Sequence, residues 1–376
     1  MGEREGTESS DPLDLTEAEE RRAARLHRES PFVDGLVAGT YYLSDPDYND
    51  RLSEAGVLAG NLTVGGPSFD FEGTVGDVAA VRRAVREHDE MYHLVETVDD
   101  IAAAATTERT GIILGFQGAN WMGNDLDRVR SMYELGVRIV DPTYNRGNTL
   151  GDGCCERRDA GLTALGQEMV SLCNELGIVL DTAHCNDSTT GDVIERSDDP
   201  VIQSHIGCRA IANAQGRAKT DAQLGAVAAG GGVNCITPFP PVIKRDPETH
   251  RVLQATIHDV LDHIDHAVEV GGAESVAFGS DMSDRTLDAG SIHQGSNLAT
   301  WRTTHPEVYG AGSTERMDPY PVGLSRLTEI ENLARGLVAR GYDDDAIEGI
   351  LGGNLLRVFE DVWSETADTW SDIEYK

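Results

Sequence analysis

Two histidines in the middle of the chain each end a short apolar run, and this pattern is the strongest sign of chemistry in the sequence. The run from Val179 ends at His184, and the run from Val201 ends at His205. Runs rich in Val, Ile and Leu predict buried strands, whose ends hold side chains rigidly. Neutral imidazole is the commonest metal ligand in proteins, so two neighbouring strand ends could present two ring nitrogens to one zinc ion. The alternative is two unrelated histidines at the rim of a core.

Two further polar residues are expected at strand ends. If the strands form a parallel barrel, Gln117 and Asp281 stand with the histidines at the carboxyl ends, where barrel enzymes keep their active sites. Two histidines and a carboxylate would fill three positions of a tetrahedral zinc ion and leave the fourth for water, whose pKa zinc lowers to about 7. Asp281 could instead be the base that moves the proton, because both uses require a carboxylate beside the metal.

The elements that would position these residues alternate along the chain in the order of an α/β barrel. Eight strands are expected at residues 32–37, 55–64, 111–118, 137–141, 179–184, 201–205, 232–236 and 275–281. Helices are expected at 75–94, 126–135, 163–176, 188–196, 221–229 and 253–270, and three more, at 325–340, 343–351 and 354–362, close the chain. This order predicts a (β/α)₈ barrel of the TIM type with C-terminal helices. A doubly wound sheet is the alternative, but no Gly-x-Gly-x-x-Gly turn follows the first strand.

The chain is expected to form one domain preceded by a tail. Residues 1–30 predict an acidic tail and a short helix at 16–28, capped by Asp14 or Thr16. Residues 31–376 predict a single barrel domain with its C-terminal helices, because no internal repeat or low-complexity linker divides them. The first thirty residues lack an apolar segment, and no run of eighteen apolar residues occurs, so we expect a cytoplasmic protein without a membrane anchor.

The charge of the chain is extreme. The formal net charge is −34, from 65 acidic residues against 31 basic ones, and lysine occurs only at Lys219, Lys244 and Lys376. Such a surface repels nucleic acid and anionic membranes, and it repels itself at low ionic strength, so we expect a cell of high internal salt. Attraction of a cationic substrate is the competing interpretation. The six cysteines include no Cys-x-x-Cys pair and predict buried thiols, not a disulfide framework.

Several motifs together resemble those of the membrane (renal) dipeptidases. They are Asp181-Thr182-Ala183-His184, Gln203-Ser204-His205, Gly279-Ser280-Asp281, the segment from Asp159 to Gly166 and the closing run from Ile350 to Phe359. The similarity extends from about Pro31 to Trp363, nearly the whole chain. It implies a metallo-dependent hydrolase barrel, a homodimer with two zinc ions, that hydrolyses the peptide bond of small dipeptides.

The resemblance also implies roles for individual residues. His184 and His205 match zinc ligands of the family, and Asp281 matches its active-site aspartate. Arg217 matches the arginine that holds the substrate carboxylate, a role suited to a bidentate guanidinium.

Three of the family's metal ligands are missing from this chain. The first strand of the family ends Asp-Gly-His-x-Asp, whereas here Leu36 and Ala38 stand in place of the two ligands. The bridging glutamate of the family falls at Gln117, whose amide cannot bridge two cations as a carboxylate does. The histidine that stabilises the oxyanion aligns with Tyr144, whose phenol could donate the same hydrogen bond.

These losses predict one metal ion per subunit instead of two. Zinc is the expected ion, and manganese or another divalent metal is the alternative. The loop at 144–161 could replace a ligand through Cys154 or Glu156; a thiolate would favour zinc, and a carboxylate would be less selective. The alternative for this loop is a glycine-rich turn with a salt-bridged Glu156. A second long loop, 282–322, carries His293, Trp301 and His305 and is typical of a lid or a subunit contact.

Three functions are compatible with these residues. The first is a metal-dependent hydrolase of a dipeptide or small amide, in which Arg217 holds a free carboxylate, Asp281 moves the proton, and Tyr144 or Gln117 orients the carbonyl oxygen. The second is a single-metal relative that acts on a different small compound with a carbon-nitrogen bond. The third is a non-catalytic barrel that binds a small carboxylate ligand.

Overall fold

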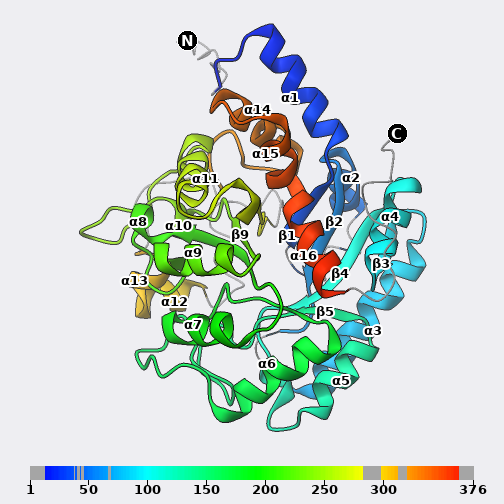
Figure 1. Ribbon diagram of the computed structural model, residues 1–376, viewed down its shortest axis with the longest axis vertical. Helices are drawn as coiled ribbons and strands as arrows, with labels where there is room; N and C mark the ends of the chain where they lie inside the picture. The colour runs from blue at the N-terminus through cyan, green and yellow to red at the C-terminus, as the bar shows by residue number, and fades with distance from the viewer. Residues whose placement is uncertain are drawn as a thin grey trace, which may run out of the picture.

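The computed structural model of the protein describes residues 13–37, 39, 43, 46–66, 69–282, 298–311 and 320–363. Within these residues, parallel strands form two sheets surrounded by helices (Figure 1). One sheet has the order β1-β2-β4-β5-β6 with β3 paired to β4, and the other has the order β10-β9-β7-β8. The strands are β1 Phe32–Val37, β2 Val57–Thr63, β3 Tyr92–Val95, β4 Thr110–Phe116, β5 Val137–Val140, β6 Val179–Leu180, β7 Ile202–Cys208, β8 Ala218–Lys219, β9 Val233–Ile236 and β10 Val276–Phe278.

Backbone contacts join the two sheets at both edges. Between β6 and β7, the Thr182 N–H donates to the Ile202 carbonyl at 3.1 Å, and Asp181 forms a parallel bridge to Ile202. Between β10 and β1, the Asp281 N–H donates to the Leu36 carbonyl at 3.0 Å. The order around the ring is therefore β1, β2, β4, β5, β6, β7, β9 and β10, which is the predicted eight-stranded barrel, with β3 and β8 outside the ring.

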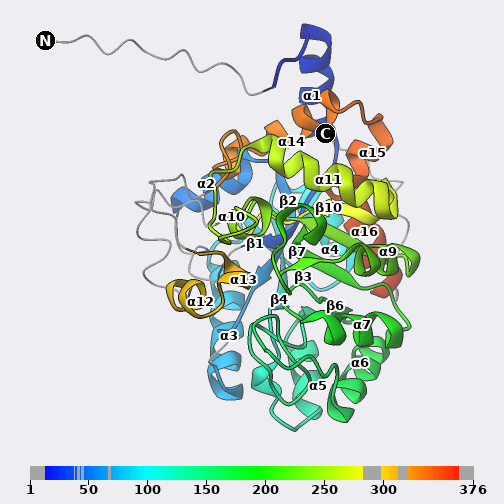
Figure 2. The same ribbon diagram turned by 90° about the vertical axis from the view of Figure 1, so that its left-hand side faces the viewer.

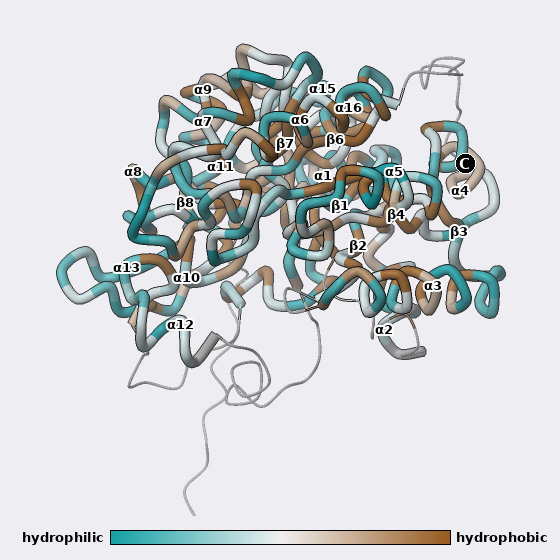
Figure 3. The backbone as a smooth tube through the Cα atoms, turned by 90° about the horizontal axis from the view of Figure 1, so that it is seen from below, coloured by the Kyte–Doolittle hydropathy of each residue, from teal (hydrophilic) through white to brown (hydrophobic). Residues whose placement is uncertain are grey.

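Alternate residues along the strands face the barrel interior and the surrounding helices. In β4, Ile113 belongs to one buried cluster, and its neighbours Ile112 and Leu114 belong to another. The interior cluster takes a residue from every barrel strand: Val33, Ala59, Ile113, Ile139, Val179, Ile202, Val233 and Ala277. Strands buried on both faces read as continuous apolar runs, which is why the sequence revealed all eight. Hydrophobic stretches accordingly gather in the middle of the molecule in Figure 3.

Sixteen α-helices lie in the described part of the chain. They are α1 Glu17–Glu29, α2 Pro46–Glu54, α3 Phe71–Glu87, α4 Val98–Thr106, α5 Asp127–Glu134, α6 Ala164–Leu176, α7 Asp187–Arg196, α8 Arg209–Ala212, α9 Asp221–Ala229, α10 Pro240–Ile243, α11 Ile257–Gly271, α12 Leu298–Thr304, α13 Pro306–Tyr309, α14 Glu331–Ala339, α15 Asp344–Glu348 and α16 Asn354–Val362. Figure 2 shows α12 and α13 near α10, on the described part of the long loop after β10.

Helix α1 is attached to the C-terminal helices α14 and α15, which lie beside it in Figure 1. Thr16 is its cap: the Glu19 N–H donates to the Thr16 hydroxyl at 3.4 Å, and the Glu19 carboxylate accepts the Thr16 N–H at 2.8 Å. The Asp344 carboxylate binds both Arg22 and Arg25 at 2.6 Å. These ion pairs therefore join the first helix to α15, near the C-terminal end of the fold.

The structure differs most from the predicted elements near residue 92. The helix expected at 75–94 ends as α3 at Glu87, and Tyr92–Val95 form β3 because they pair with the edge of β4 from Thr110 to Ile113. Helices α2 and α4 were not predicted. Ala38, the tail at 1–12 and His293 lie outside the described residues. No helix in the ranges described above is long and apolar enough to cross a membrane.

Candidate active site

The two histidines predicted as metal ligands lie together at the carboxyl ends of β6 and β7. Their Nε2 atoms are 3.0 Å apart, and both side chains are buried. The rings are tilted by 54° with their centroids 4.9 Å apart. At this separation, the two nitrogens can share a metal ion or a proton, whereas two facing lone pairs alone would repel each other.

The other ring nitrogen of His184 is held by an amide. Its Nδ1 lies 2.9 Å from Asn145 Oδ1, in the loop that follows β5. The Tyr309 hydroxyl donates to the same oxygen at 2.5 Å, and the Cys154 thiol donates to it at 3.3 Å. Because Asn145 Oδ1 accepts from these groups, we assign the His184 Nδ1 as protonated, which leaves a lone pair on Nε2.

The other ring nitrogen of His205 begins a chain of hydrogen bonds to a buried carboxylate. Its Nδ1 lies 2.8 Å from the Ser204 hydroxyl, and that hydroxyl donates to Asp181 Oδ2. Because the Ser204 hydroxyl donates its one proton to Asp181, its oxygen must accept a hydrogen bond from His205 Nδ1. This arrangement also leaves a lone pair on Nε2, as a histidine that ligates a metal requires.

Both imidazoles are held in the neutral form. Burial lowers the pKa of His184 and of His205 well below 6.5, and the positive charges of Arg217 and Lys219 act in the same direction. A proton shared between the rings is therefore disfavoured. The pair fits a divalent metal of the zinc class, since its two lone pairs converge and its two Nδ1 atoms are fixed by partners.

Among the residues that the structure describes, no third ligand lies with the two histidines. In the ranges that the structure describes, no group of three or more His, Cys, Asp or Glu side chains could hold a metal ion. Cys154 is on the Nδ1 side of His184, where its thiol contacts Asn145. Glu156 is exposed, accepts the Gly147 N–H at 2.9 Å and lines an open hollow of about 470 Å³. The predicted three-ligand set is therefore not formed in this structure.

Asp281 follows β10 and is half-buried. Its φ angle of +46° lies in the left-handed region, which aspartate tolerates better than most residues. Burial raises the pKa of Asp281 to about 7, with Arg217 opposing the shift and Asp34 adding to it. A carboxyl with this pKa can both accept and return a proton near neutral pH.

Arg217 is buried beside the histidines. Its Nη1 donates to the Ala183 carbonyl at 2.7 Å, and its buried Nε has no hydrogen-bond partner. Burial lowers the pKa of Arg217, but Tyr309, Cys154 and Asp281 outweigh that effect and the net shift is upward. An always-charged guanidinium with an unused buried donor is suited to an anionic group of a ligand.

Tyr144, Gln117 and Leu36 are the remaining predicted residues. The Tyr144 ring stacks on His184 with centroids 4.2 Å apart, and burial raises the pKa of its phenol, which keeps it protonated. Gln117 donates from Nε2 to the Thr63 hydroxyl at 2.7 Å. Leu36, which stands where the family has a metal-binding histidine, is buried in β1.

Sequence reasoning missed the residues that orient the histidines. Asn145 is one residue beyond the predicted Tyr144, and its position in the long loop after β5 was the available signal. Tyr309 lies on α13, more than a hundred residues away in sequence from both histidines. Its position depends on Arg245, whose guanidinium donates to three carbonyls of the α13 segment.

Comparisons with known proteins identify solved structures that share this fold. An amidohydrolase from Pseudomonas aeruginosa is similar to 91% of this chain and 99% of its own, with 29% identity and a TM-score of 0.78. A metallo peptidase from Rhodobacter sphaeroides, liganded with a phosphinate mimic of the dipeptide L-Ala-D-Ala, shares the fold at a TM-score of 0.69 and 21% identity, over 89% of this chain and all of its own.

Dipeptidases are among the curated relatives of the chain. Dipeptidase 3 of Mus musculus is 26% identical over 368 residues, which cover 91% of this chain and 66% of the mouse protein. The chain thus spans just under two thirds of the length of that relative. The model of the family "Membrane dipeptidase (Peptidase family M19)" matches residues 20–290, which is more than half of the chain. The chain therefore belongs to the membrane dipeptidase family, a family of metal-dependent hydrolases built on the barrel described above.

Proposed function

We propose that this protein is a metal-dependent hydrolase that cleaves a dipeptide or another small amide bearing a free carboxylate. The observation that carries the proposal is the convergence of the His184 and His205 Nε2 atoms, 3.0 Å apart, with each opposite nitrogen fixed by a partner. The family match and the dipeptidase relatives support the same reaction class.

His184 and His205 would hold one divalent ion per subunit, with zinc the favoured ion. Such an ion supplies a hydroxide at neutral pH and polarises the scissile carbonyl. One ion is favoured over two because Leu36 and Gln117 offer no anionic oxygen or imidazole where the family has ligands. Because no carboxylate or thiolate of the described residues joins the histidines, such an ion would keep open positions for water and a substrate oxygen.

Arg217 would bind the carboxylate of the substrate. Its unused Nε and its upward-shifted pKa support this role, because a bidentate pair with a carboxylate needs a charged guanidinium with free N–H groups. The pairing would fix the scissile carbonyl relative to the histidines, and positioning of this kind is a large part of catalysis.

Asp281 would carry the proton from the attacking water to the leaving amine. Its pKa near 7 supports this role. Asp281 could also have been a metal ligand, but among the described residues it forms no three-ligand group with the histidines, which favours the role of the base. Tyr144, protonated and stacked on His184, would donate a hydrogen bond to the oxyanion, with Gln117 as the other candidate.

The assembly and the compartment are also proposed. We infer a homodimer from the family, and a high-salt cytoplasm from the net charge of −34, which strong ionic screening would make tolerable. Nucleic acid and anionic membranes are not expected partners of such a surface.

A second candidate function deserves a direct test. The neutral side chains at Leu36 and Gln117, together with the similarity to an amidohydrolase, favour a single-metal relative that acts on a small carbon-nitrogen compound other than a dipeptide.

The test is amine release from a panel of dipeptides and their C-terminal amides, with zinc-loaded or manganese-loaded protein in high salt. We expect cleavage of free dipeptides, loss of activity in His184→Ala, and in Arg217→Met a raised KM for free dipeptides but not for amidated ones. Cleavage of non-peptide amides alone would favour the second candidate. No turnover in any arm, with ligand binding that still needs Arg217, would favour a non-catalytic barrel.

A further inference from the structure

A lysine is completely buried beside the active site. Lys219 is one of only three lysines in the chain, and its side chain has no exposed surface. It lies in β8, two residues after Arg217, where β8 pairs in parallel with the carboxyl end of β7. Burying a charged side chain costs several kcal/mol unless it is well bonded, so an apolar residue would fill this space at a lower cost.

The amino group of Lys219 is fully hydrogen-bonded. Nζ donates to the Thr182 carbonyl at 2.7 Å, to the Cys185 carbonyl at 2.9 Å and to the Thr190 hydroxyl at 3.1 Å. The Thr190 hydroxyl donates its own proton to the Cys185 carbonyl at 3.4 Å, so it can only accept from Lys219. All three bonds therefore use protons of the lysine, as the ammonium form requires.

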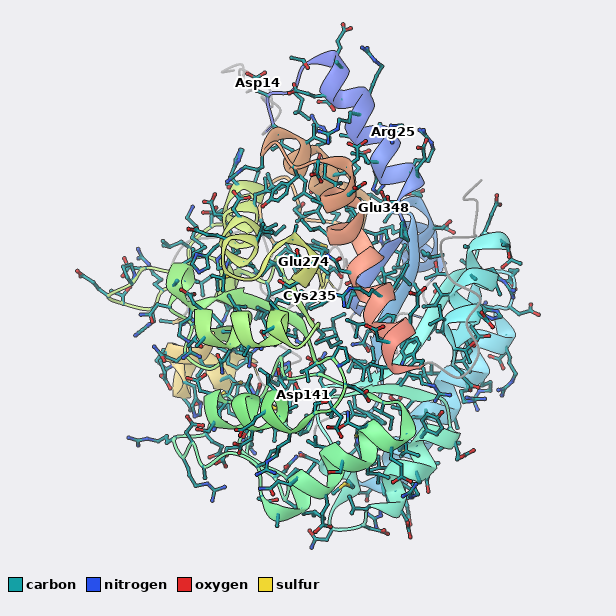
Figure 4. All side chains as sticks on the ribbon, viewed as in Figure 1. Asp14, Arg25, Asp141, Cys235, Glu274 and Glu348 are labelled. Carbon is teal, nitrogen blue, oxygen red and sulfur yellow. The ribbon has the colours of Figure 1, made fainter. Side chains whose placement is uncertain are left out.

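Two of these acceptors flank His184. The turn from Thr182 to Cys185 carries the histidine, and its carbonyls accept hydrogen bonds from Lys219 and Arg217. On the other side of the turn, Asp141 Oδ2 accepts the His184 N–H at 2.8 Å. Asp141, labelled in Figure 4, lies in the middle of the molecule and is buried. The backbone next to the histidine is thus held by the buried side chains of Lys219 and Asp141, one on each side.

We propose that Lys219 is a positioning residue that, with Asp141, fixes the backbone of His184 so that Nε2 faces His205. The ammonium holds the carbonyls of the turn, and the carboxylate holds its N–H. Both side chains bind the backbone of the turn and not the histidine ring. This inference rests on the proposed function, because it assigns Lys219 to the metal site formed by the two histidines.

The expected size of the effect follows from comparable contacts. Removing a side chain that orients a metal-binding histidine typically weakens metal binding 10- to 100-fold. In Lys219→Met, two buried carbonyls lose their donor and the turn can move. We therefore expect zinc to bind Lys219→Met about 10- to 100-fold more weakly than the wild type.

The experiment is a titration of the full-length metal-free protein with Co²⁺, followed by visible absorption, and with Zn²⁺ in competition with a chelator. Lys244→Met is the matched control, because Lys244 pairs with Asp259 at 2.9 Å on the surface and is outside the site. We expect Lys219→Met to bind more weakly and to change the Co²⁺ absorption bands, and Lys244→Met to match the wild type.

Each outcome separates the two proposals. Wild-type protein that binds no Co²⁺ or Zn²⁺ would overturn the proposed function. Metal affinity and Co²⁺ bands of folded Lys219→Met that equal those of the wild type would overturn the role of Lys219 alone. If Lys219→Met does not fold, Thr190→Val decides, because it keeps the lysine and removes one acceptor. We expect a several-fold weaker affinity in that variant, and an unchanged affinity would again overturn the inference.

Discussion

Replacing Ser204 by alanine tests whether the hydrogen-bond chain behind His205 prepares that residue for a metal. The serine hydroxyl accepts from His205 Nδ1 and donates to Asp181 Oδ2. Asp181 keeps two other donors, the backbone N–H groups of residue 204 at 3.0 Å and Ala183 at 2.9 Å. The variant therefore removes the orientation of His205 and leaves the carboxylate partly satisfied.

The size of the effect follows from the orphaned donor. A buried N–H without an acceptor costs about 1–3 kcal/mol. His205 can avoid this cost by moving its proton to Nε2, which is the nitrogen that must stay free for a metal. We expect Ser204→Ala to lose up to about 3 kcal/mol of folding stability and, through the change of tautomer, about 10- to 100-fold in zinc affinity.

Ser280→Ala is the matched control. The Ser280 hydroxyl donates to Asp34 Oδ2 at 2.5 Å, and Asp34 likewise keeps two backbone donors, but the residue after Ser280 is an aspartate. The assay measures thermal unfolding of the metal-free proteins and zinc affinity by chelator competition. We expect both variants to lose stability and only Ser204→Ala to lose zinc affinity. Equal zinc affinities in the two variants would refute the role of the chain.

Three other predictions can be checked with the same assays. Tyr309→Phe removes a donor to Asn145 Oδ1 and should weaken zinc binding by up to about tenfold, about 1.4 kcal/mol. An unchanged affinity would show that Tyr309 does not help Asn145 to orient His184. Burial raises the pKa of Asp34 from 3.8 to about 6. Between pH 4 and 6 the unfolded chain has lost this proton while the folded protein still holds it, so stability falls as the pH rises. In denaturant unfolding between pH 4 and 6, we expect the free energy of unfolding of Asp34→Asn to fall by up to about 3 kcal/mol less than that of the wild type. The same pH dependence of stability in both proteins would contradict the raised pKa of Asp34. The triple variant Leu36→His, Ala38→Asp, Gln117→Glu should bind two metal ions per subunit by elemental analysis, and unchanged stoichiometry would show that more than ligand loss separates this chain from its family.

The barrel could be predicted from sequence because its strands are buried on both faces. Val33, Ile113 and Ala277 face the interior while their neighbours face helices, so each strand is apolar throughout and easy to recognise. Strand β3 was missed because Tyr92–Val95 pairs only at an edge, and its sequence also fits the end of a helix. Tertiary pairing decided between the two.

The candidate site was predicted in part, for the same physical reason. His184 and His205 end recognisable strands, so the sequence revealed that they could meet. The positions of Cys154 and Glu156 could not be predicted in the same way, because the path of a loop and the orientation of its side chains do not follow from a sequence pattern. Cys154 turned to the far side of His184 and Glu156 to the surface. Residues such as Tyr309 reach the site only through the fold of distant segments, which no local pattern records.

The central claim is that His184 and His205 hold one metal ion between their Nε2 atoms. The most direct measurement is the number of zinc ions per subunit, by elemental analysis of protein dialysed to equilibrium in high salt, in the wild type, His184→Ala, His205→Ala and the control His266→Ala. His266 is a suitable control because it pairs with Asp221 at 2.8 Å, outside the site. We predict one zinc ion in the wild type and the control and none in the two site variants. Full retention of zinc in His184→Ala and His205→Ala would contradict the account.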